Sequence, residues 1–453
     1  MSAIIDSDDN KVLLYGDRLK LLRESKNISQ QALADALGSD VAKIKQMEHG
    51  VTLCDSGRVA EIREILDADF LPLLDSEIPA FRERLYIWRD MIRNRKLDEA
   101  KELQSKIAGI VDLDVEVGLI SLYSMFEITL LIVQGDFAKA TLKLDDTDKA
   151  LMDTESRYYY FRNKGTISTL NENFEDALML FSQALEIGKS DEWILKDDDS
   201  IYYNIALCYY NLHLPHHALG FLHESGKMYT TDRVTPFGWH IDSAIAVNYI
   251  RTNQLTEAAR ILERCLVFAE ASGDKTLIAI TLHNYGFMHQ MADNWLLAAN
   301  YYGKSSSICE QGSDLHLENL YQESRCCMEL GDYSKSVRLI ESAKAHFSRE
   351  INHMLSDTST AQFAMLFETL GHLLNVILEC EGDAETEIVG HSAAFIEVTA
   401  IPYSINIYKY THVLDYCKVL GKYYEKANAF EKSLAINKIA MEIYKKMLYY
   451  RRN

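Results

Sequence analysis

Proline, glycine and positive charge are all scarce in this sequence. Its 453 residues include only five prolines and 21 glycines. Because these residues interrupt helices and form tight turns, their scarcity excludes a turn-rich β-sandwich and favours long helices. With 47 basic and 67 acidic residues the net charge is −20, which excludes a protein that coats nucleic acid or an anionic membrane by bulk electrostatics. Any binding to DNA must depend on a small surface that matches the DNA in shape and hydrogen bonding, not on the overall charge of the protein.

Signatures of catalysis, metal binding and export are also lacking. No HExxH, GxxxxGK[ST], GxGxxG or CxxC pattern occurs, and the eight cysteines are scattered through apolar stretches. This usage indicates reduced thiols of a cytosolic protein. The acidic N-terminus has neither the basic nor the apolar region of a secretory signal. The most apolar segment, 115–133, contains two glutamates and so predicts a buried helix, not a membrane span. We expect no enzyme, no metal site, no cofactor and no membrane contact.

What is present is an ordinary globular composition on a long chain. Hydrophobic residues make up 48% and charged residues 25%, which excludes a largely disordered protein. The chain is too long for one compact core, so it predicts either two or three domains or an extended repeat array.

Residues 16–66 predict a compact helical unit. Leu19 and Leu22 give the first helix an apolar face, and Ser29 is a good N-cap for a second helix over 30–37. Gly38 permits a tight turn, after which Asp40 caps a third helix that ends near His49. Helix, short glycine-containing turn and helix are the helix-turn-helix pattern.

The run 29–50, SQQALADALGSDVAKIKQMEHG, resembles the Cro/repressor-type helix-turn-helix. The resemblance implies that the helix over 40–49 enters the major groove. It assigns DNA contacts to Gln30, Val41, Ala42, Lys43 and Gln46, and a structural salt bridge to Arg23 and Glu48. The alternative is a helical hairpin that only caps the next domain. Residues 16–50 carry six basic and five acidic side chains, so useful affinity requires two such units in a dimer. A basic cluster over 82–96 is expected to form a solvated face.

From about residue 80 a short motif recurs, an apolar or aromatic residue followed three positions later by a small one. Its first positions lie 37 to 41 residues apart between Leu97 and Tyr333, and it returns at Phe430. Nine residues upstream a small residue is frequent, such as Gly165 and Gly286, which lets two helices approach closely. The pattern resembles a slightly lengthened tetratricopeptide repeat (TPR), with clearest units at 155–188, 198–228, 237–272, 275–311, 315–347 and 405–447. The stretch 355–402 departs from it, because GHSAAFIEVTAIP stands where a second helix is expected.

The first helices of such repeats line a concave surface. Positions 12, 8, 5 and 4 before the motif are expected to face it. This gives Arg162, Tyr203, Leu207, Asn211, Ser243, Val247, Arg251, His283, Phe287, Gln290, Tyr321 and Arg325. Amides bind a peptide backbone, arginines bind carboxylates and aromatics fill pockets, so this set suits an extended peptide.

Asparagine recurs one position after the first of these, at Asn163, Asn204 and Asn284. Two interpretations stay open. It is either a consensus residue of the repeat with a structural role, or, as in peptide-clamping members of the family, a side chain that grips the ligand backbone.

A repressor-type helix-turn-helix followed by TPR-like repeats resembles the peptide-responsive regulators of Gram-positive bacteria and their phages, the RRNPP group (Rgg, PlcR, PrgX, NprR and arbitrium receptor-like proteins). The resemblance implies an all-α fold, a helix-turn-helix followed by a right-handed TPR-like solenoid. It divides the chain into a tail (1–15), a DNA-binding domain (16–70), a linker (71–79) and about nine helix pairs (80–453).

The same resemblance implies a cytosolic homodimer that binds operator DNA and is switched by a short signalling peptide. The dimer would form through the C-terminal repeats. Two alternatives remain: an interaction scaffold of the Rap type that acts on a partner such as a response regulator, or a DNA-binding protein whose groove binds another protein.

Overall fold

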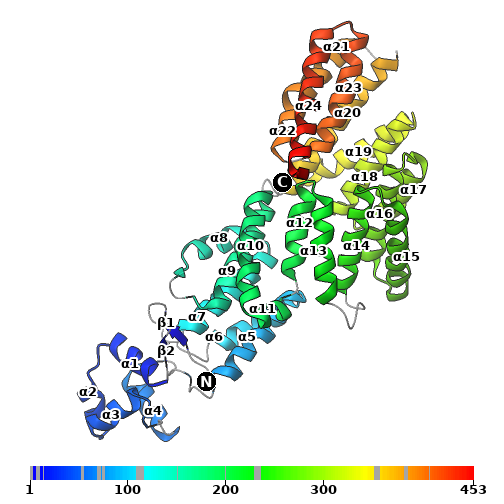
Figure 1. Ribbon diagram of the computed structural model, residues 1–453. Helices are drawn as coiled ribbons and strands as arrows, with labels where there is room; N and C mark the ends of the chain where they lie inside the picture. The colour runs from blue at the N-terminus through cyan, green and yellow to red at the C-terminus, as the bar shows by residue number, and fades with distance from the viewer. Residues whose placement is uncertain are drawn as a thin grey trace. The chain divides into compact units, whose positions relative to one another are not determined.

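The computed structural model of the protein describes residues 4–6, 11–13, 15–52, 56–68, 73, 77–108, 117–149, 152–198, 200–228, 236–350, 358–381, 386–407 and 409–452. Two compact units, Met1–Ile201 (unit 1) and Tyr202–Asn453 (unit 2), make up the chain. The fold is helical with a TPR-like arrangement of helix pairs (Figure 1). The exception is an antiparallel pairing of β1 (Ile4–Asp6) with β2 (Lys11–Leu13). This short hairpin lies in the segment that the sequence assigned to a tail in an all-α chain.

Four short helices begin unit 1: α1 (Tyr15–Ser25), α2 (Gln30–Ala36), α3 (Val41–Glu48) and α4 (Ser56–Ile65). Ser29 and Asp40 accept backbone N–H groups of α2 and α3 as side-chain caps, as their positions predicted. The helices share one buried apolar cluster that includes Leu22, Leu33 and Ile44. A close approach fixes α1 against the end of α3, because a Cβ on Gly16 would lie 2.4 Å from the Met47 carbonyl oxygen.

Three helix pairs complete unit 1. They are α5 (Ile78–Arg93) with α6 (Leu97–Ala108), α7 (Val117–Val133) with α8 (Phe137–Asp145), and α9 (Thr154–Leu170) with α10 (Phe174–Ser190). A short helix, α11 (Glu192–Asp197), follows. Leu119, Leu122, Met125, Phe126 and Ile128 of α7 are buried, as predicted for this apolar segment.

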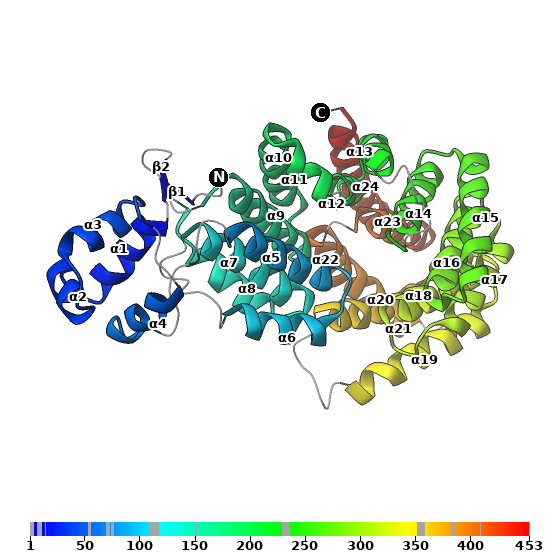
Figure 2. The same cartoon turned by 90° about the horizontal axis from the view of Figure 1, so that it is seen from below.

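Unit 2 contains six further pairs. They are α12 (Ser200–Asn211) with α13 (Pro215–Met228), α14 (Pro236–Arg251) with α15 (Leu255–Ser272), α16 (Lys275–Met291) with α17 (Trp295–Ile308), and α18 (Asp314–Glu329) with α19 (Tyr333–Glu350). The last are α20 (Thr358–Glu381) with α21 (Thr386–Phe395) and α22 (Ile401–Asn406), and α23 (Tyr410–Lys426) with α24 (Phe430–Arg452). Figure 2 shows the second helices α15 and α17 on one side of the first helices α14, α16 and α18.

The small residue upstream of the motif has the predicted packing role. A Cβ on Gly165 would lie 2.7 Å from the Phe181 ring, and one on Gly286 would lie 2.8 Å from the Tyr302 ring. In both pairs the aromatic ring of the second helix therefore rests on the backbone of the first.

Turns within the pairs share one conformation. The residue two positions before the second helix has φ between +56° and +81° in eight pairs, where it is Arg95, Gly135, Glu172, His213, Asn253, Asp293, Gly331 or Asn428. Glycine and asparagine favour this left-handed conformation, but arginine and glutamate do not. The fold therefore imposes the turn even where the residue resists it.

The stretch 355–402, which is expected to depart from the repeat, has an irregular second helix. Residues Thr386–Asn406 form α21 and α22, joined through a π-helical turn at Ile396–Ala400. The extra residue of a π-turn changes the phase of the helix, and Ile396, Ala400 and Ile401 remain buried. Pro402 is tolerated because it lies in the first turn of α22.

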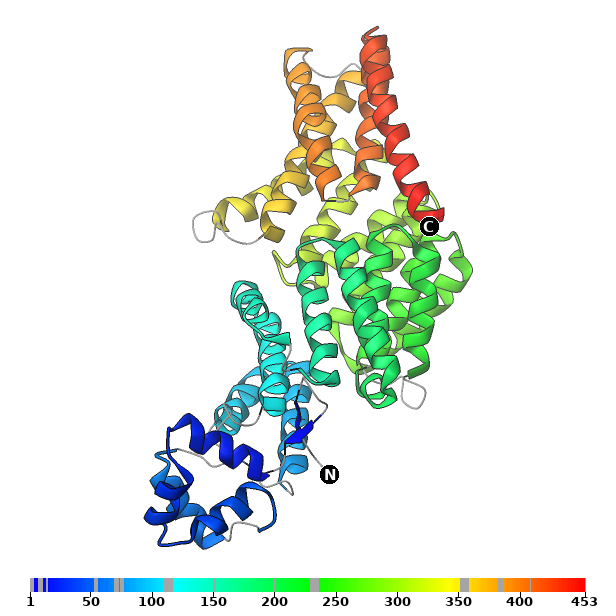
Figure 3. The ribbon, with the colours of Figure 1, turned by 60° about the vertical axis from the view of Figure 1, so that its left-hand side comes forward.

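The final pairs share the largest core cluster, which includes Leu370 and Leu373 of α20 and Val413 and Leu420 of α23. Within α20, Ala361–Cys380 is the one segment among the described residues with the length and apolar composition of a membrane span, and 44% of it is buried in the protein. Its contacts in the cluster are those of a core helix. The last helix, α24, ends the stack in Figure 3.

Candidate functional site

Helix α3 presents a polar face to solvent. Ala42, Lys43 and Gln46 are exposed, whereas Val41 is half-buried against the apolar cluster. The exposed residues lie one turn apart on one side of the helix, so three of the predicted DNA contacts share a face. Val41 also contributes to the packing that holds α3 in place.

A buried ion pair links α1 to the end of α3. The Arg23 Nε donates to Glu48 Oε1 at 2.6 Å, and both side chains are buried. The hydrogen bond with Glu48 raises the pKa of Arg23. Gln30, predicted to bind DNA, donates through Nε2 to the same carboxylate at 2.6 Å. Gln30 therefore also orients the end of α3.

The first helix of the third pair, α9, holds Arg162 in a closed network. Its Nε lies 2.6 Å from Asp198 Oδ2, and Nη2 donates to Ser200 Oγ at 3.1 Å. The Tyr158 hydroxyl donates to Asp198 as well. Burial is the largest single influence and disfavours the charged carboxylate, but the charge of Arg162 and the hydrogen bonds from Ser200 together outweigh it and lower the pKa of Asp198. Sequence reasoning missed Asp198 because it lies outside the repeated positions.

Asn163 is fully buried and has its partners inside unit 1. Its Nδ2 donates to the Met125 carbonyl at 2.8 Å, and its Oδ1 accepts from the Thr129 hydroxyl. The amide thus joins α9 to α7, which supports the structural interpretation at this repeat.

The expectation of a solvated basic face over 82–96 is wrong for two residues. Arg82 Nη1 lies 2.7 Å from Glu155 Oε2, and Arg89 is buried and donates to the Tyr159 hydroxyl at 3.0 Å. Burial raises the pKa of Glu155 despite Arg82. Because α5 and α9 pack together, these arginines balance buried polar groups instead of facing water.

In unit 2, Arg251 of α14 crosses to α12. Its guanidinium lies 3.8 Å from the centre of the Tyr210 ring, and Nη1 donates to the Tyr210 carbonyl at 3.2 Å. The His213 Nδ1 lies 3.4 Å from the same nitrogen. Cation–π stacking and the hydrogen bond together fix Arg251 on the face formed by the first helices.

The predicted residues of α16 bridge to the neighbouring first helices. His283 Nδ1 lies 2.9 Å from Asn319 Oδ1 of α18, and Gln290 donates to Gln322 at 3.4 Å. Asn284 is buried and donates to the hydroxyl of Ser243 on α14 at 2.8 Å. These contacts fix the spacing of α14, α16 and α18.

Asn204 differs from the other two recurring asparagines. Its side chain is half-exposed and forms no hydrogen bond with any described residue. Nearby positions of the same helix face are half-buried, including Tyr203 and Leu207 of α12 and Asn211, whose Nδ2 donates to the Leu207 carbonyl. Val247 and Phe287 continue the half-buried set on α14 and α16. Asn204 is thus the recurring asparagine with an amide available to a ligand.

Arg325 of α18 contacts α23, the first helix of the last helix pair. It forms an ion pair with Asp415 of α23, and its guanidinium lies 5.9 Å from the centre of the buried Tyr321 ring. The Tyr321 ring also lies 5.3 Å from the ring of His412. Burial, reinforced by the charge of Arg325, lowers the pKa of His412 well below its usual range. Asp415 and His412 escaped the sequence analysis, because no repeated pattern marks their positions.

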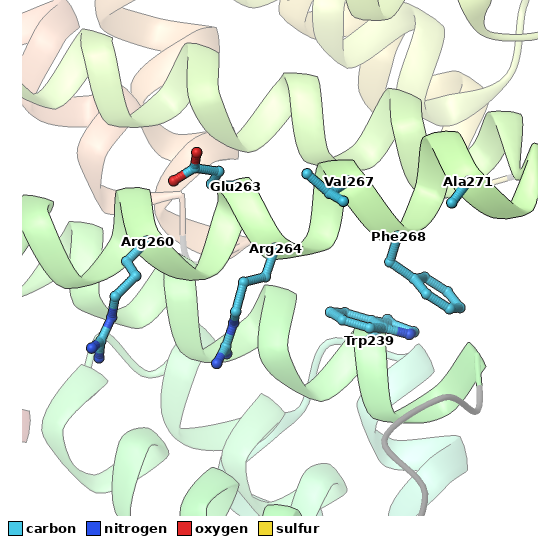
Figure 4. Close-up of a pocket in the computed structure, with 7 residues that line it drawn as sticks. All are labelled: Trp239, Arg260, Glu263, Arg264, Val267, Phe268 and Ala271. Carbon is cyan, nitrogen blue, oxygen red and sulfur yellow. The ribbon is translucent and has the colours of Figure 1, made fainter.

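Two cavities lie in unit 2. The first, about 280 Å³, is lined by α18, α20 and α23 with the first residues of α17 and α19, and Arg325 and Asp415 border it. The second, about 600 Å³, lies against α15 and the start of α14 (Figure 4). There Trp239 stacks on Phe268 at 4.3 Å, Val267 is exposed, and the side chains of Arg260 and Arg264 extend along the same side.

Among the described residues, no group of three or more His, Cys, Asp or Glu side chains is arranged to hold a metal ion. The histidines over 213–223 contact aromatic rings: His217 stacks on Tyr209, and His223 lies 6.3 Å from the Tyr249 ring.

Sequence comparison finds similarity to a transcriptional activator. No protein-family profile matches the chain. The transcriptional activator NprA of Geobacillus stearothermophilus is 21% identical over 374 residues, which are 81% of this chain and 88% of the relative.

Solved structures share the fold over most of the chain. A Rap protein complexed with competence and sporulation factor has a TM-score of 0.62 and 16% identity, and covers 82% of this chain and 99% of its own. The apo quorum sensor NprR from B. thuringiensis has a TM-score of 0.61 and 20% identity, with the same coverage. NprR in complex with its cognate peptide NprX has a TM-score of 0.59 and 20% identity, and covers 81% of this chain and 99% of its own. These matches confirm the resemblance to the peptide-responsive TPR regulators and the helical, TPR-like fold.

Proposed function

We propose that this protein is a cytosolic transcriptional regulator that binds operator DNA as a homodimer and is switched by a short signalling peptide. The observation that carries the proposal is the likeness, over four fifths of the chain, to the fold of NprR and Rap proteins solved with signalling peptides. The transcriptional activator NprA, similar over 81% of the chain, supports a role in transcription.

The DNA-binding part of the proposal rests on α3. Its exposed Lys43 and Gln46 stand on a helix fixed by the Arg23–Glu48 pair and by the apolar cluster. A side chain that reads a base edge contributes about 1–3 kcal/mol. Gln46→Ala should weaken operator binding by that amount, whereas Lys43→Ala should lower the dependence of affinity on salt by about one phosphate contact. Lys101→Ala, an exposed lysine of α6, is the control and should change neither.

The dimer is proposed to form through α24. Phe430, Leu434, Met441 and Tyr444 lie on one face of this helix and are between 54% and 65% exposed. A contiguous apolar stripe of this kind marks an interaction site. Leu434→Asp should shift the protein to monomers in sedimentation equilibrium, and with them operator affinity should fall. A dimer of unchanged stability would rule out this face.

The peptide part rests on the first helices of unit 2. Asn204 offers a free amide, and Arg251 lies on the same face. A bound peptide that favours one arrangement of the dimer would shift operator affinity through a coupling free energy. Arg251→Ala should weaken the peptide response and leave DNA binding without peptide near normal. Equal loss of both would contradict the assignment of Arg251 to the peptide.

The test is fluorescence anisotropy with the DNA upstream of the protein's own gene, with and without candidate peptides encoded by the neighbouring reading frame. A tenfold change in affinity corresponds to about 1.4 kcal/mol of coupling. Specific binding that changes by this factor is expected. If the protein binds this DNA specifically but no peptide changes the affinity, it would still be a DNA-binding regulator. The surface formed by the first helices would then bind a protein partner instead of a peptide.

A second candidate function is a Rap-like module that acts on a protein partner such as a response regulator. The pocket beside Trp239 and Phe268 favours it, because an exposed apolar surface with aromatic rings suits a protein partner. Its lining also includes Arg260, Glu263 and Arg264, and Arg264 is paired with Asp242. No specific DNA binding, together with loss of binding to a purified response regulator in Val267→Asp, would favour this candidate over the first.

A further inference from the structure

The cavity between α18, α20 and α23 combines apolar walls with a charged rim. Leu370, Leu373 and Ile377 of α20 and Val419 of α23 form much of its wall. Its volume of about 280 Å³ is slightly below the roughly 300–1,000 Å³ of sites for drug-sized ligands. It therefore has room for one large apolar side chain with its backbone, not for a longer segment.

The charged rim has an excess of positive charge. Arg325, Lys418 and Lys422 face Glu329 and Asp415, so the local sum is +1 in a chain whose net charge is −20. Lys418 lies 3.6 Å from Glu329. Lys422 forms no ion pair with any described residue. A ligand with one negative charge would bring the sum of charges around the cavity to zero.

Arg325 lies deeper than the carboxylate that neutralises it. The side chain of Arg325 is 22% exposed and that of Asp415 is 42% exposed. Leaving a largely buried guanidinium without a partner is costly, but exchanging one carboxylate for another is not. In place, burial raises the pKa of Asp415 although the charges of Arg325 and Lys418 oppose this shift. Once displaced from Arg325, the 42% exposed carboxylate can be solvated further and still has Lys418 nearby. The pair is therefore suited to exchange.

We propose that this cavity takes the C-terminal residue of the peptide, an apolar side chain whose free α-carboxylate replaces Asp415 on Arg325. The inference rests on the proposed peptide receptor and specifies its ligand class. It also gives binding a mechanical result, because the exchange removes the ion pair that ties α18 to α23. The ligand then joins Arg325 on α18 to the wall that α20 and α23 supply.

The probe is a set of random heptapeptide pools, each with one fixed C-terminal residue (leucine, phenylalanine, serine or lysine), synthesised as free acid and as amide. The full-length protein is incubated with each pool, bound peptides are identified by mass spectrometry, and the Kd of individual hits is measured by calorimetry. Leucine and phenylalanine acids should be selected, and amidation of a hit should weaken its binding at least tenfold.

Two variants test the geometry. Asp415→Asn removes the competing carboxylate and should strengthen binding of the free acids about fivefold, with no gain for the amides. Leu373→Trp should fill the cavity and abolish binding. Glu270→Gln on α15 and Leu142→Trp on α8, matched changes at exposed positions, should leave the Kd unchanged. Circular dichroism checks that each variant folds, and the acid–amide comparison requires no variant.

The possible results distinguish failure of the proposed site for the peptide C-terminus from failure of the proposed peptide receptor. Peptides that bind equally well as acid and amide, or more weakly to Asp415→Asn, would overturn the subsite and leave the peptide receptor standing. If no pool yields a binder and no peptide changes operator affinity, the receptor itself is wrong and the inference falls with it.

Discussion

Units 1 and 2 carry equivalent repeat residues that have different surroundings. In unit 1, Arg162 forms an ion pair with Asp198, and Asn163 forms hydrogen bonds with Met125 and Thr129. In unit 2, Asn204 has no partner among the described residues, and Arg325 is paired with a half-exposed aspartate beside a cavity. The difference shows that a residue's availability to a ligand depends on what the neighbouring helices supply, not on its position in the repeat.

Breaking one ion pair in each unit tests this comparison most strongly. Asp198→Asn leaves Arg162, whose side chain is 19% exposed, beside a buried site without a carboxylate, which should lower the free energy of unfolding by about 3–5 kcal/mol. Asp415→Asn also leaves a largely buried arginine, but Asp415 is 42% exposed against 7% for Asp198, so water reaches the site and the loss should be smaller, about 1–2 kcal/mol. Urea unfolding with hydrogen exchange in α9 and α18 measures both losses. Losses of equal size would contradict the comparison.

Helix packing should show no such difference between the units. Gly286→Ala in unit 2 places a methyl group against Tyr302, and Gly165→Ala in unit 1 does the same against Phe181. Each should destabilise the protein by about 1–3 kcal/mol. Gly220→Ala in α13, where no atom lies within 4 Å, is the control and should stabilise by about 0.5–1 kcal/mol. Thermal unfolding gives the three values, and a neutral Gly286→Ala would refute the close packing.

Acid should loosen unit 2 before unit 1. Thirteen of the 14 histidines lie in unit 2, and burial, with Arg325 and Lys409 nearby, lowers the pKa of His412. The unfolded chain then takes up a proton that the folded chain refuses, so stability is full above about pH 6.5 and falls below it. The slope from one group is at most about 1.4 kcal/mol per pH unit. Urea midpoints from pH 7.5 to 5.5 measure it, and His412→Phe should reduce the slope; an unchanged slope would exclude His412.

The smallest expected effect separates two asparagines. Asn204→Ala should weaken peptide binding by about 1 kcal/mol, the usual net value of a hydrogen bond, and leave stability unchanged. Asn163→Ala should lower stability by about 1–3 kcal/mol, because it removes both hydrogen bonds that join α9 to α7 and leaves a void at a fully buried position. Calorimetric titration and urea unfolding of both variants measure these effects. Loss of peptide affinity without loss of stability in Asn163→Ala would reverse the assignment.

Local signals in the sequence were sufficient to predict the helix pairs and the capped helices near the N-terminus. The motif marks the start of the second helix in eight pairs, all but the one that contains α20, and Ser29 and Asp40 cap the helices that they were expected to cap. The π-turn at Ile396–Ala400 was missed, because its phase shift depends on burial by α20 and α23 and not on a local signal.

Candidate site residues were predictable only in part, for a related reason. Their spacing before the motif assigned Arg162 and Arg325 to the concave surface formed by the first helices. Their partners Asp198 and Asp415 lie 36 and 90 residues farther along the chain, outside any repeated pattern. Whether an arginine can meet a ligand is decided by these distant carboxylates, which sequence periodicity does not reveal.

The uniform turns within the helix pairs limit how this architecture can evolve. Three residues, with the middle one in the left-handed conformation, join the helices of eight pairs. One inserted residue would rotate the second helix by about 100° and expose its buried face. Connections between pairs vary far more, from two residues between α15 and α16 to eight residues between α8 and α9. Insertions and deletions should therefore accumulate between pairs, so that lineages diversify by changing the joints between modules while each module keeps its internal geometry.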